Sequence, residues 1–176
     1  MFSFFIALRN RLFSLFYRGI LKRIFFRLDP EFVHDRMIVV GKTLGRFTVT
    51  RKATSVMFGY RNPALEQTIN GIRFANPIGL SAGFDKNAVL TDILPSVGFG
   101  FIEVGSITGE PCAGNPGRHL WRLPKSQSLV VYYGLKNDGC EAIAHRLRAK
   151  KLSGVVGISI AKTNNVETCE TSAGVS

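Results

Sequence analysis

Short apolar runs alternate with helical patterns in the second half of the chain. Residues 77–83, 99–105 and 155–160 are apolar or small almost throughout, whereas 87–97 and 138–151 repeat their apolar residues at helical spacing. Runs without polar alternation are typical of strands buried on both faces, and strands that alternate with helices pair in parallel. The pattern predicts an α/β fold in which strand, helix, strand, helix and strand build a parallel sheet.

The two predicted helices have clear apolar faces. Basic residues at the end of the second helix also match the helix dipole. The apolar faces consist of Val89, Leu90, Ile93 and Leu94 in the first helix and of Ile143 and Leu147 in the second.

The first 27 residues are both basic and rich in Phe, Leu and Ile. Their longest charge-free run, residues 1–8, is far shorter than the roughly 18 apolar residues of a membrane-spanning helix. At about 100° per residue, one charge-free sector collects the apolar side chains, which is typical of a helix lying in a membrane interface. The alternatives are a cleaved signal peptide, an organellar transit peptide or a core helix. The sector contains Phe2, Ile6, Phe13, Tyr17, Ile20 and Ile24.

A second helix is expected to begin at Asp29, Pro30 and Glu31, which provide an N-cap, a first-turn proline and a first-turn acid. It should run through Val40. Residues 41–70 are mixed and Thr/Arg-rich, and predict a linker with a turn at 61–63 that leads to a short strand pair within 68–74.

Charge is concentrated in the N-terminal part of the chain. The net charge is +11, and residues 1–52 hold eleven Lys or Arg but three Asp or Glu. Such a segment suits anionic lipid or nucleic acid, and charge alone does not separate the two. The cysteines at 112, 140 and 169 form no C-x-x-C pair, which argues against a disulfide framework or a zinc site and favours a reducing compartment.

Candidate chemistry follows the predicted strands, because parallel sheets place their sites at the carboxyl ends of strands. Small residues in 81–86 and 105–106 would let a flat ligand approach the backbone, and Lys86 offers a positive charge to an anionic group. The alternatives are turn-making glycines and a solvated lysine. No G-x-G-x-x-G motif follows the first strand, which disfavours a dinucleotide-binding site. The periodicity does not distinguish an open parallel sheet from a barrel.

Six blocks follow one another along the chain: LDPEFVH, NPIGLSAGFDKNA, GFGFIEVGSIT, GNPGRHLWRLP, YYG and GVVGISIAKTNN. Together they carry a resemblance to a known family. The chain resembles quinone-dependent (class 2) dihydroorotate dehydrogenases over residues 26–165, which implies a (β/α)8 TIM barrel. The chain would supply its N-terminal portion of about three strands, after a small helical membrane-contacting segment. The implied divisions are 1–45 (membrane-associating), 46–75 (linker and barrel-bottom strands) and 76–176 (barrel).

The resemblance implies an FMN site and a substrate pocket. Ala82, Gly83 and Lys86 would lie along the FMN ring, with Lys86 also near the orotate carboxylate. Ser106 would contact FMN, and Ser159 stands where the family usually has an FMN-contacting asparagine. The catalytic serine base of the family is expected beyond Ser176, so no catalytic residue and no metal ligand is assigned within this chain. The pocket would be lined by Val131, Tyr132, Tyr133, Gly134 and Leu135.

The implied activity is oxidation of dihydroorotate to orotate in pyrimidine (UMP) biosynthesis, with FMN as cofactor and a membrane quinone as acceptor. The protein would associate peripherally with the cytoplasmic face of the inner membrane and bind no nucleic acid, and this chain alone would be an incomplete, inactive portion. The family has an asparagine-arginine pair where this chain has Val131 and Tyr132. The Val131 side chain cannot hydrogen-bond a pyrimidine amide, so recognition of orotate would require Asn137 to take that role. Other FMN barrel oxidoreductases with a different substrate, and a non-enzymatic basic membrane-binding module, therefore stay open.

Cys112 and the three histidines receive no catalytic role in this interpretation. Cys112 falls in the insertion after the second strand, away from the strand ends. His34, His119 and His145 are scattered among different elements and are expected to be surface or packing residues.

Overall fold

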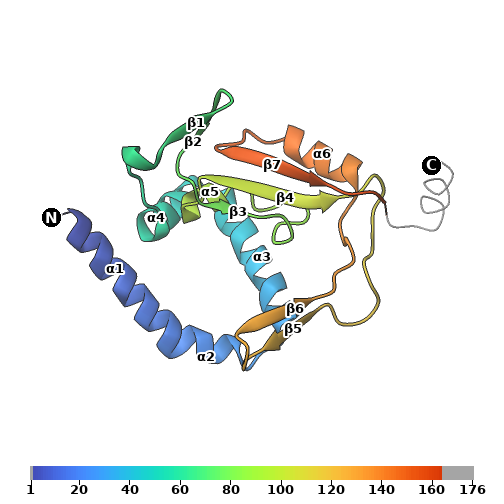
Figure 1. The fold of residues 1–176 in the computed structure, drawn as a ribbon, viewed down its shortest axis with the longest axis horizontal. Helices are drawn as coiled ribbons and strands as arrows, with labels where there is room; N and C mark the ends of the chain where they lie inside the picture. The colour runs from blue at the N-terminus through green and yellow to red at the C-terminus, as the bar shows by residue number, and fades with distance from the viewer. Residues whose placement is uncertain (1, 164–176) are drawn as a thin grey trace. The chain divides into compact units, whose positions relative to one another are not determined.

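The computed structural model describes residues 2–163 (Figure 1). The chain divides into two compact units. The helical unit comprises residues 1–37 and 120–131. The sheet unit comprises residues 38–119 and 132–176.

A nearly continuous helix begins the helical unit. It consists of α1 (Phe2–Phe16), a π-helical segment η1 (Tyr17–Leu21) and α2 (Lys22–Phe25), which confirms the predicted helicity of this basic segment. A π-helix has more residues per turn than an α-helix, so the apolar sector drawn at a constant 100° does not continue unbroken from α1 into α2. Most of the large apolar side chains along this helix are exposed.

Helix α3 (Pro30–Arg46) begins where the sequence predicted it. The Asp29 side chain accepts hydrogen bonds from the backbone N–H groups of Glu31 (2.9 Å) and Phe32 (3.1 Å), as an N-cap residue does. Pro30 occupies the first helical position, where no N–H is needed. The capping prediction is confirmed.

The insertion after the second predicted strand contains a β-hairpin that the sequence pattern did not reveal. Strands β5 (Leu120–Leu123) and β6 (Ser128–Val131) pair antiparallel, with Leu120 opposite Val131. Arg122 ties the hairpin to the end of α2, because its guanidinium donates to the Leu28 carbonyl at 2.6 Å and lies 5.0 Å from the centre of the Phe26 ring. The hairpin therefore belongs to the helical unit.

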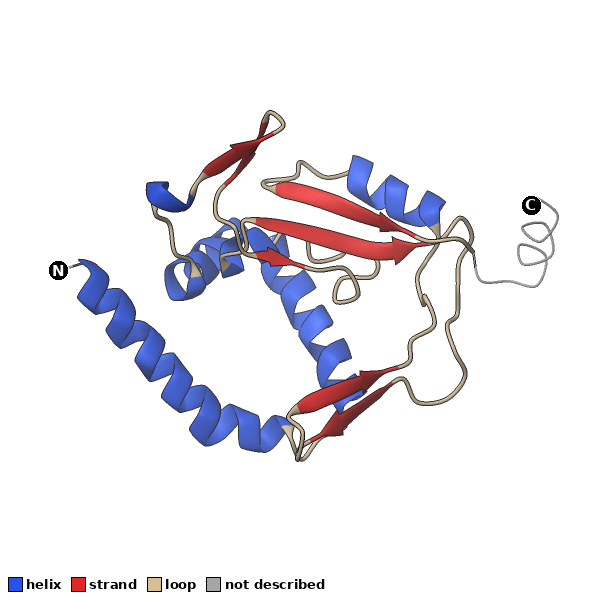
Figure 2. Ribbon diagram, in the orientation of Figure 1, coloured by secondary structure: helices blue, strands red, loops and turns tan. Residues whose placement is uncertain are grey.

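Three parallel strands form the centre of the sheet unit (Figure 2). Strands β3 (Gly79–Leu80), β4 (Phe101–Ile107) and β7 (Val155–Ile160) lie in that order, with Phe101 paired to both Gly79 and Val155. The predicted parallel sheet is confirmed. The predicted strand pair is also present, as β1 (Gln67–Ile69) and β2 (Ile72–Phe74) joined by a tight turn at residues 70–71.

Two apolar clusters pack against this sheet, and Val156 of β7 contacts both. Helix α6 (Cys140–Arg148) contributes Ile143 to the first cluster and Leu147 against it, as its apolar stripe predicted. The first cluster consists of Ala88, Val104, Ile107 and Ile143, and the second of Leu90, Ile93, Leu94 and Ile102.

The predicted helix over residues 87–97 is wrong in extent. Only α5 (Leu94–Val97) is helical, and turns precede it. Asp85 is the physical reason, because its carboxylate accepts the backbone N–H groups of Val89 (2.9 Å) and Leu90 (2.8 Å), and Ala88 has φ +53°. Short polar side chains that bond nearby backbone groups offer an alternative to the helix. The apolar residues are nevertheless buried as expected.

The predicted linker over residues 41–70 is also largely helical. Helix α3 extends to Arg46, and α4 (Thr48–Phe58) follows before the short 3₁₀ helix η2 (Pro63–Leu65). A Cβ on Gly41 would lie 2.8 Å from Leu90, and one on Gly45 would lie 3.2 Å from Asp92. These glycines therefore allow α3 to approach residues 90–93 closely, and packing outweighs their poor helix propensity.

Strand β7 differs from the expectation of burial on both faces. Ile158 is 50% exposed and Ile160 is 84% exposed. Within residues 2–163, β7 pairs with β4 along one edge and with no strand along the other.

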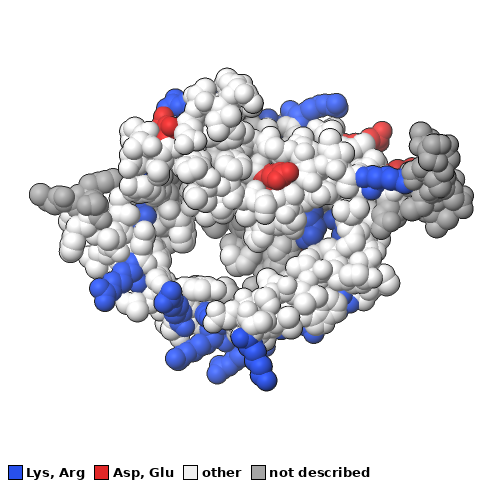
Figure 3. Space-filling view, viewed as in Figure 1, with Lys and Arg blue, Asp and Glu red and all other residues white. Residues whose placement is uncertain are grey.

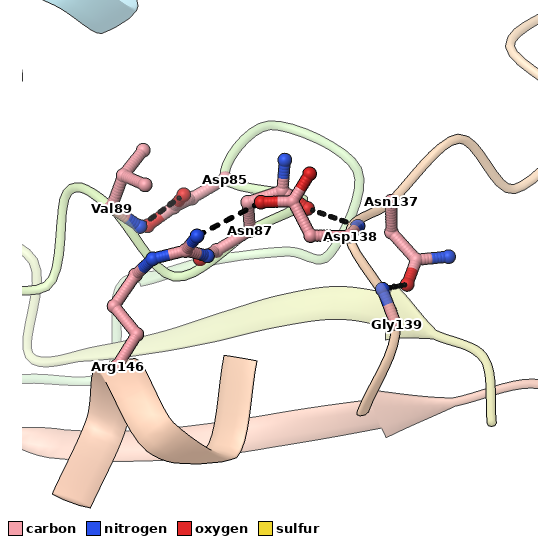
Figure 4. A network of polar contacts seen from close by, with 7 residues as sticks. All are labelled: Asp85, Asn87, Val89, Asn137, Asp138, Gly139 and Arg146. Carbon is pink, nitrogen blue, oxygen red and sulfur yellow. Dashed lines mark hydrogen bonds and ion pairs between the residues drawn. The ribbon is translucent and has the colours of Figure 1, made fainter. Parts of the chain in front are cut away.

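A polar network joins the loop after β3 to the start of α6 (Figure 4). The Asn87 side chain accepts the backbone N–H of Asp138 at 2.9 Å, and Arg146 donates to both the Asp138 carboxylate (2.9 Å) and the Asn87 carbonyl. Burial raises the pKa of the Asp85 carboxyl, and its hydrogen bonds from Leu90 and Val89 oppose that shift. The loop is thus held by the hydrogen bonds of Asp85 within it and by the hydrogen bonds of Asn87 with Asp138 and Arg146.

We expect Asp85→Ala to destabilise the complete protein by about 3 kcal/mol, because two buried N–H groups lose their acceptor and each such loss costs about 1–3 kcal/mol. The measurement is the free energy of unfolding from chemical denaturation. Asp92→Ala is the matched control, because Asp92 makes a partly exposed ion pair with Lys150 and its loss should cost less than about 1 kcal/mol. Equal destabilisation by the two variants would contradict the role of Asp85.

Candidate functional site

The carboxyl ends of β3, β4 and β7 meet through direct hydrogen bonds. After β3, the Gly83 N–H donates to the Gly105 carbonyl at 2.8 Å, and the Gly105 N–H donates to the Asp85 carbonyl at 3.2 Å. From β4, the Ser106 hydroxyl lies 2.7 Å from the Ser159 hydroxyl of β7. Three segments predicted separately to carry chemistry, one after each of these strands, therefore form one edge.

Two glycines shape the backbone of this edge. Gly83 has φ +103°, and a Cβ built there would meet no atom within 4 Å, so the space beside it is open. Gly105 has φ +107°, and its Cβ would lie 2.6 Å from the Ser159 carbonyl. Gly105 is thus required by packing, whereas Gly83 leaves an open stretch of backbone that a flat ring can approach. The neighbouring Ala82 is half-buried.

The serine pair supplies polar groups at the same edge. Ser106 and Ser159 are both half-buried, and either hydroxyl can donate to the other. When one donates within the pair, the other keeps its proton for a further acceptor. The pair can therefore donate one hydrogen bond to a ligand.

Lys86 is held against an aromatic ring. Its ammonium lies 3.6 Å from the centre of the Tyr133 ring, well within the range of a cation–π contact. Tyr133 in turn stacks on His119, with 5.0 Å between ring centres and 5° between ring planes. His119 is buried, as expected of a packing residue. Its stacking on Tyr133 was not predicted, because no sequence pattern indicated the hairpin that brings the two residues together.

The residues of the predicted substrate segment, 131–135, differ in exposure and in contacts. Tyr133 lies beside Lys86, and Gly134 and Leu135 follow it with positive φ values of 64° and 59°. Val131 is the last residue of β6 and is exposed, as is Tyr132. Within the sheet unit, Tyr133 is the member of this segment whose side chain contacts a predicted cofactor-binding residue.

Asn137 does not replace the missing hydrogen-bonding side chain at Val131. Its Oδ1 accepts the N–H groups of Thr108 (3.3 Å) and Gly139 (2.8 Å), and its Nδ2 donates to the Thr108 hydroxyl (2.8 Å) and the Leu135 carbonyl (2.7 Å). All four positions of the amide are occupied in a buried setting. The hypothesis that Asn137 recognises a pyrimidine is therefore wrong.

Cys112 also has a structural setting. It pairs with Asn137 in an isolated β-bridge, and its thiol donates to the Gly134 carbonyl at 3.4 Å. Among residues 2–163, no group of three or more His, Cys, Asp or Glu side chains is arranged to hold a metal ion. The chemistry of this edge comes from backbone, hydroxyl and ammonium groups.

The sequence and the fold both match known proteins. A family model described as dihydroorotate dehydrogenase matches residues 64–173. The dihydroorotate dehydrogenase (quinone) of a Nocardioides species is 40% identical over 163 residues, covering 88% of this chain and 42% of that protein. The corresponding protein of Roseiflexus castenholzii is 37% identical over 147 residues, covering 83% and 40%.

A solved structure agrees with these relatives. The ligand-free dihydroorotate dehydrogenase of Eimeria tenella superposes with a TM-score of 0.62 at 32% identity, covering 79% of this chain and 40% of that one. The chain spans about 40% of the length of the curated relatives it matches. Its three parallel strands are part of the (β/α)8 barrel of these enzymes. The chain belongs to the dihydroorotate dehydrogenase family.

Proposed function

We propose that the complete protein oxidises dihydroorotate to orotate in pyrimidine (UMP) biosynthesis, with FMN as cofactor and a membrane quinone as the final electron acceptor. The observation that carries this proposal is that hydrogen bonds join Gly83 to Gly105 and Ser106 to Ser159 at the strand ends. The names of the relatives support the same activity.

The open backbone at the end of β3 fits a flavin ring. Ala82 and Gly83 would lie against the flat face of FMN, because a Cβ at Gly83 meets nothing within 4 Å. The Ser106–Ser159 pair would donate one hydrogen bond to the polar edge of the ring. Bound FMN supplies the hydride acceptor, and the protein supplies orientation and charge.

Lys86 would serve both the cofactor and the substrate. Its ammonium can pair with the carboxylate of dihydroorotate and can stabilise negative charge that develops on a reduced ring. Tyr133, Gly134 and Leu135 would frame the pocket beside it, and Val131 and Tyr132 would line its continuation. We assign no catalytic base within residues 2–163.

A second candidate function is oxidation of a different cyclic substrate by an FMN barrel enzyme. Two observations favour it: Val131 offers no side-chain hydrogen bond, and the Asn137 amide is fully occupied. An enzyme discriminates strongly for a substrate with a polar group only when its site contains a hydrogen-bonding partner for that group. Val131 supplies no such partner. The two candidates share the flavin site and differ in the substrate.

The helical unit is proposed to bind the membrane surface. Among residues 2–163, no helix is long and apolar enough to cross a bilayer. The helical unit instead combines exposed apolar residues such as Phe4, Leu12 and Ile20 with nine Lys or Arg against three Asp or Glu. Figure 3 shows Lys and Arg side chains along the N-terminal helical segment. We propose peripheral association with the cytoplasmic face of the inner membrane, through residues 1–45, where a quinone could reach the protein.

We expect Lys86→Ala to lower dihydroorotate turnover by about 100-fold, because one charged or donor group in a water-poor site is typically worth about 3 kcal/mol of transition-state stabilisation. The measurement is steady-state kinetics of the complete protein with dihydroorotate and a soluble quinone. Lys151→Ala, at an exposed position in the loop after α6, is the control and should keep full activity. A loss of less than about threefold would remove Lys86 from the proposed site.

Deleting residues 1–27 should reduce binding of the complete protein to anionic vesicles, since both apolar contacts and cations are lost. The measurement is co-sedimentation with phosphatidylglycerol vesicles at low salt. A full-length variant with Arg9, Arg11 and Arg18 changed to Gln separates charge from apolar contact, and should bind with intermediate strength. Equal sedimentation of the intact and deleted proteins would show that this segment is not the membrane contact.

A further inference from the structure

Three distant parts of the chain meet at the Tyr133 ring. Lys86 comes from the loop after β3, His119 directly precedes β5, and Tyr133 follows β6. The ammonium of Lys86 lies 3.6 Å from the centre of the ring, and the imidazole of His119 stacks on it almost in parallel. The position of the ring therefore bears directly on the position of the lysine.

The ring offers Lys86 a fixed partner. A lysine side chain has four flexible methylenes, so its ammonium samples many positions unless something holds it. An aromatic face carries negative charge density and attracts an ammonium at this distance. The contact with Tyr133 restricts the lysine near the end of β3.

Tyr133 is itself held by a set of hydrogen bonds between residues 115–119 and 132–133. His119 Nε2 lies 2.7 Å from the Asn115 carbonyl, which orients the imidazole. The Asn115 N–H donates to the Tyr133 carbonyl at 3.1 Å, and the Tyr132 N–H donates to the His119 carbonyl at 2.7 Å. Residues 115–119 therefore hold both the ring of Tyr133, which stacks on His119, and its backbone carbonyl, which accepts the Asn115 N–H.

We propose that Tyr133, supported by His119, is a positioning residue for Lys86. It acts through the lysine, and its ring face keeps the ammonium where an anionic substrate and a flavin would need it. The consequence for turnover rests on the proposed function, whereas the effect on Lys86 itself is a property of the protein without ligands.

The first test measures the reactivity of Lys86 in the complete protein without flavin. Limited labelling with an acetylating reagent is read out residue by residue by mass spectrometry. Labelling of Lys86 should rise about threefold or more in Tyr133→Leu, which removes the ring, and should stay within about twofold in Tyr133→Phe, which keeps it. Lys151, at an exposed position in the loop after α6, is the internal reference and should label equally in all the folded proteins.

Two results would overturn the proposal: unchanged labelling of Lys86 in Tyr133→Leu, or equal labelling in the Phe and Leu variants. If the Leu variant unfolds, labelling of Lys150 rises as well, because in the folded protein its ammonium is held by Asp92 and Thr91. Tyr133→Met then replaces it, because methionine fills an irregular space without an aromatic face. The same comparison with Tyr133→Phe decides the outcome.

The second test separates positioning from a structural role by kinetics with dihydroorotate. Tyr133→Leu should lower kcat/KM by about tenfold while Tyr133→Phe restores it, because the ring face and not the hydroxyl holds the ammonium. Faster labelling of Lys86 without any change in kcat or KM would contradict a positioning role. If Lys86→Ala itself leaves turnover intact, the proposed function of Lys86 fails while the labelling result still stands.

Discussion

The buried carboxylate of Asp85 is the constraint on which the candidate site depends. It accepts two backbone N–H groups from the residues that follow it, and its own carbonyl accepts the N–H of Gly105. The first two bonds turn the loop after β3 back toward the core, and the third joins that loop to β4. Gly83 and Lys86 flank Asp85 closely in the chain, so its placement sets where the open backbone and the ammonium lie.

The sheet was predictable from the sequence because its information is local. Apolar runs at 99–105 and 155–160 indicate buried strands wherever they occur, and Asp29 with Pro30 marks a helix start without reference to the rest of the fold. The same local signals failed at 87–97, where helical spacing was correct but a single carboxylate diverted the backbone. They failed again at Thr48–Phe58, where a Thr-rich segment is helical despite weak intrinsic propensity.

The site was predictable only in part, for a related reason. Residues at strand ends could be named because parallel strands bring their carboxyl ends together, and the Ser106–Ser159 contact follows from that rule. The contact of Lys86 with Tyr133 and His119 depends on how a long insertion returns to the sheet, and no spacing in the sequence encodes it. Asn137 could be named from the sequence as a ligand-binding residue, but its amide makes four hydrogen bonds within the protein.

We propose that the strand ends hold a flavin and present Lys86 to an anionic substrate. The family assignment supports flavin chemistry, and Val131 makes the identity of the substrate the property to measure. The most direct measurement is the absorbance of flavin bound to the complete protein when dihydroorotate is added without oxygen. If dihydroorotate is the substrate, the oxidised flavin band is lost rapidly and orotate forms. A flavin-loaded protein whose band does not change would contradict dihydroorotate as the substrate, and a purified protein that binds no flavin would contradict the site itself.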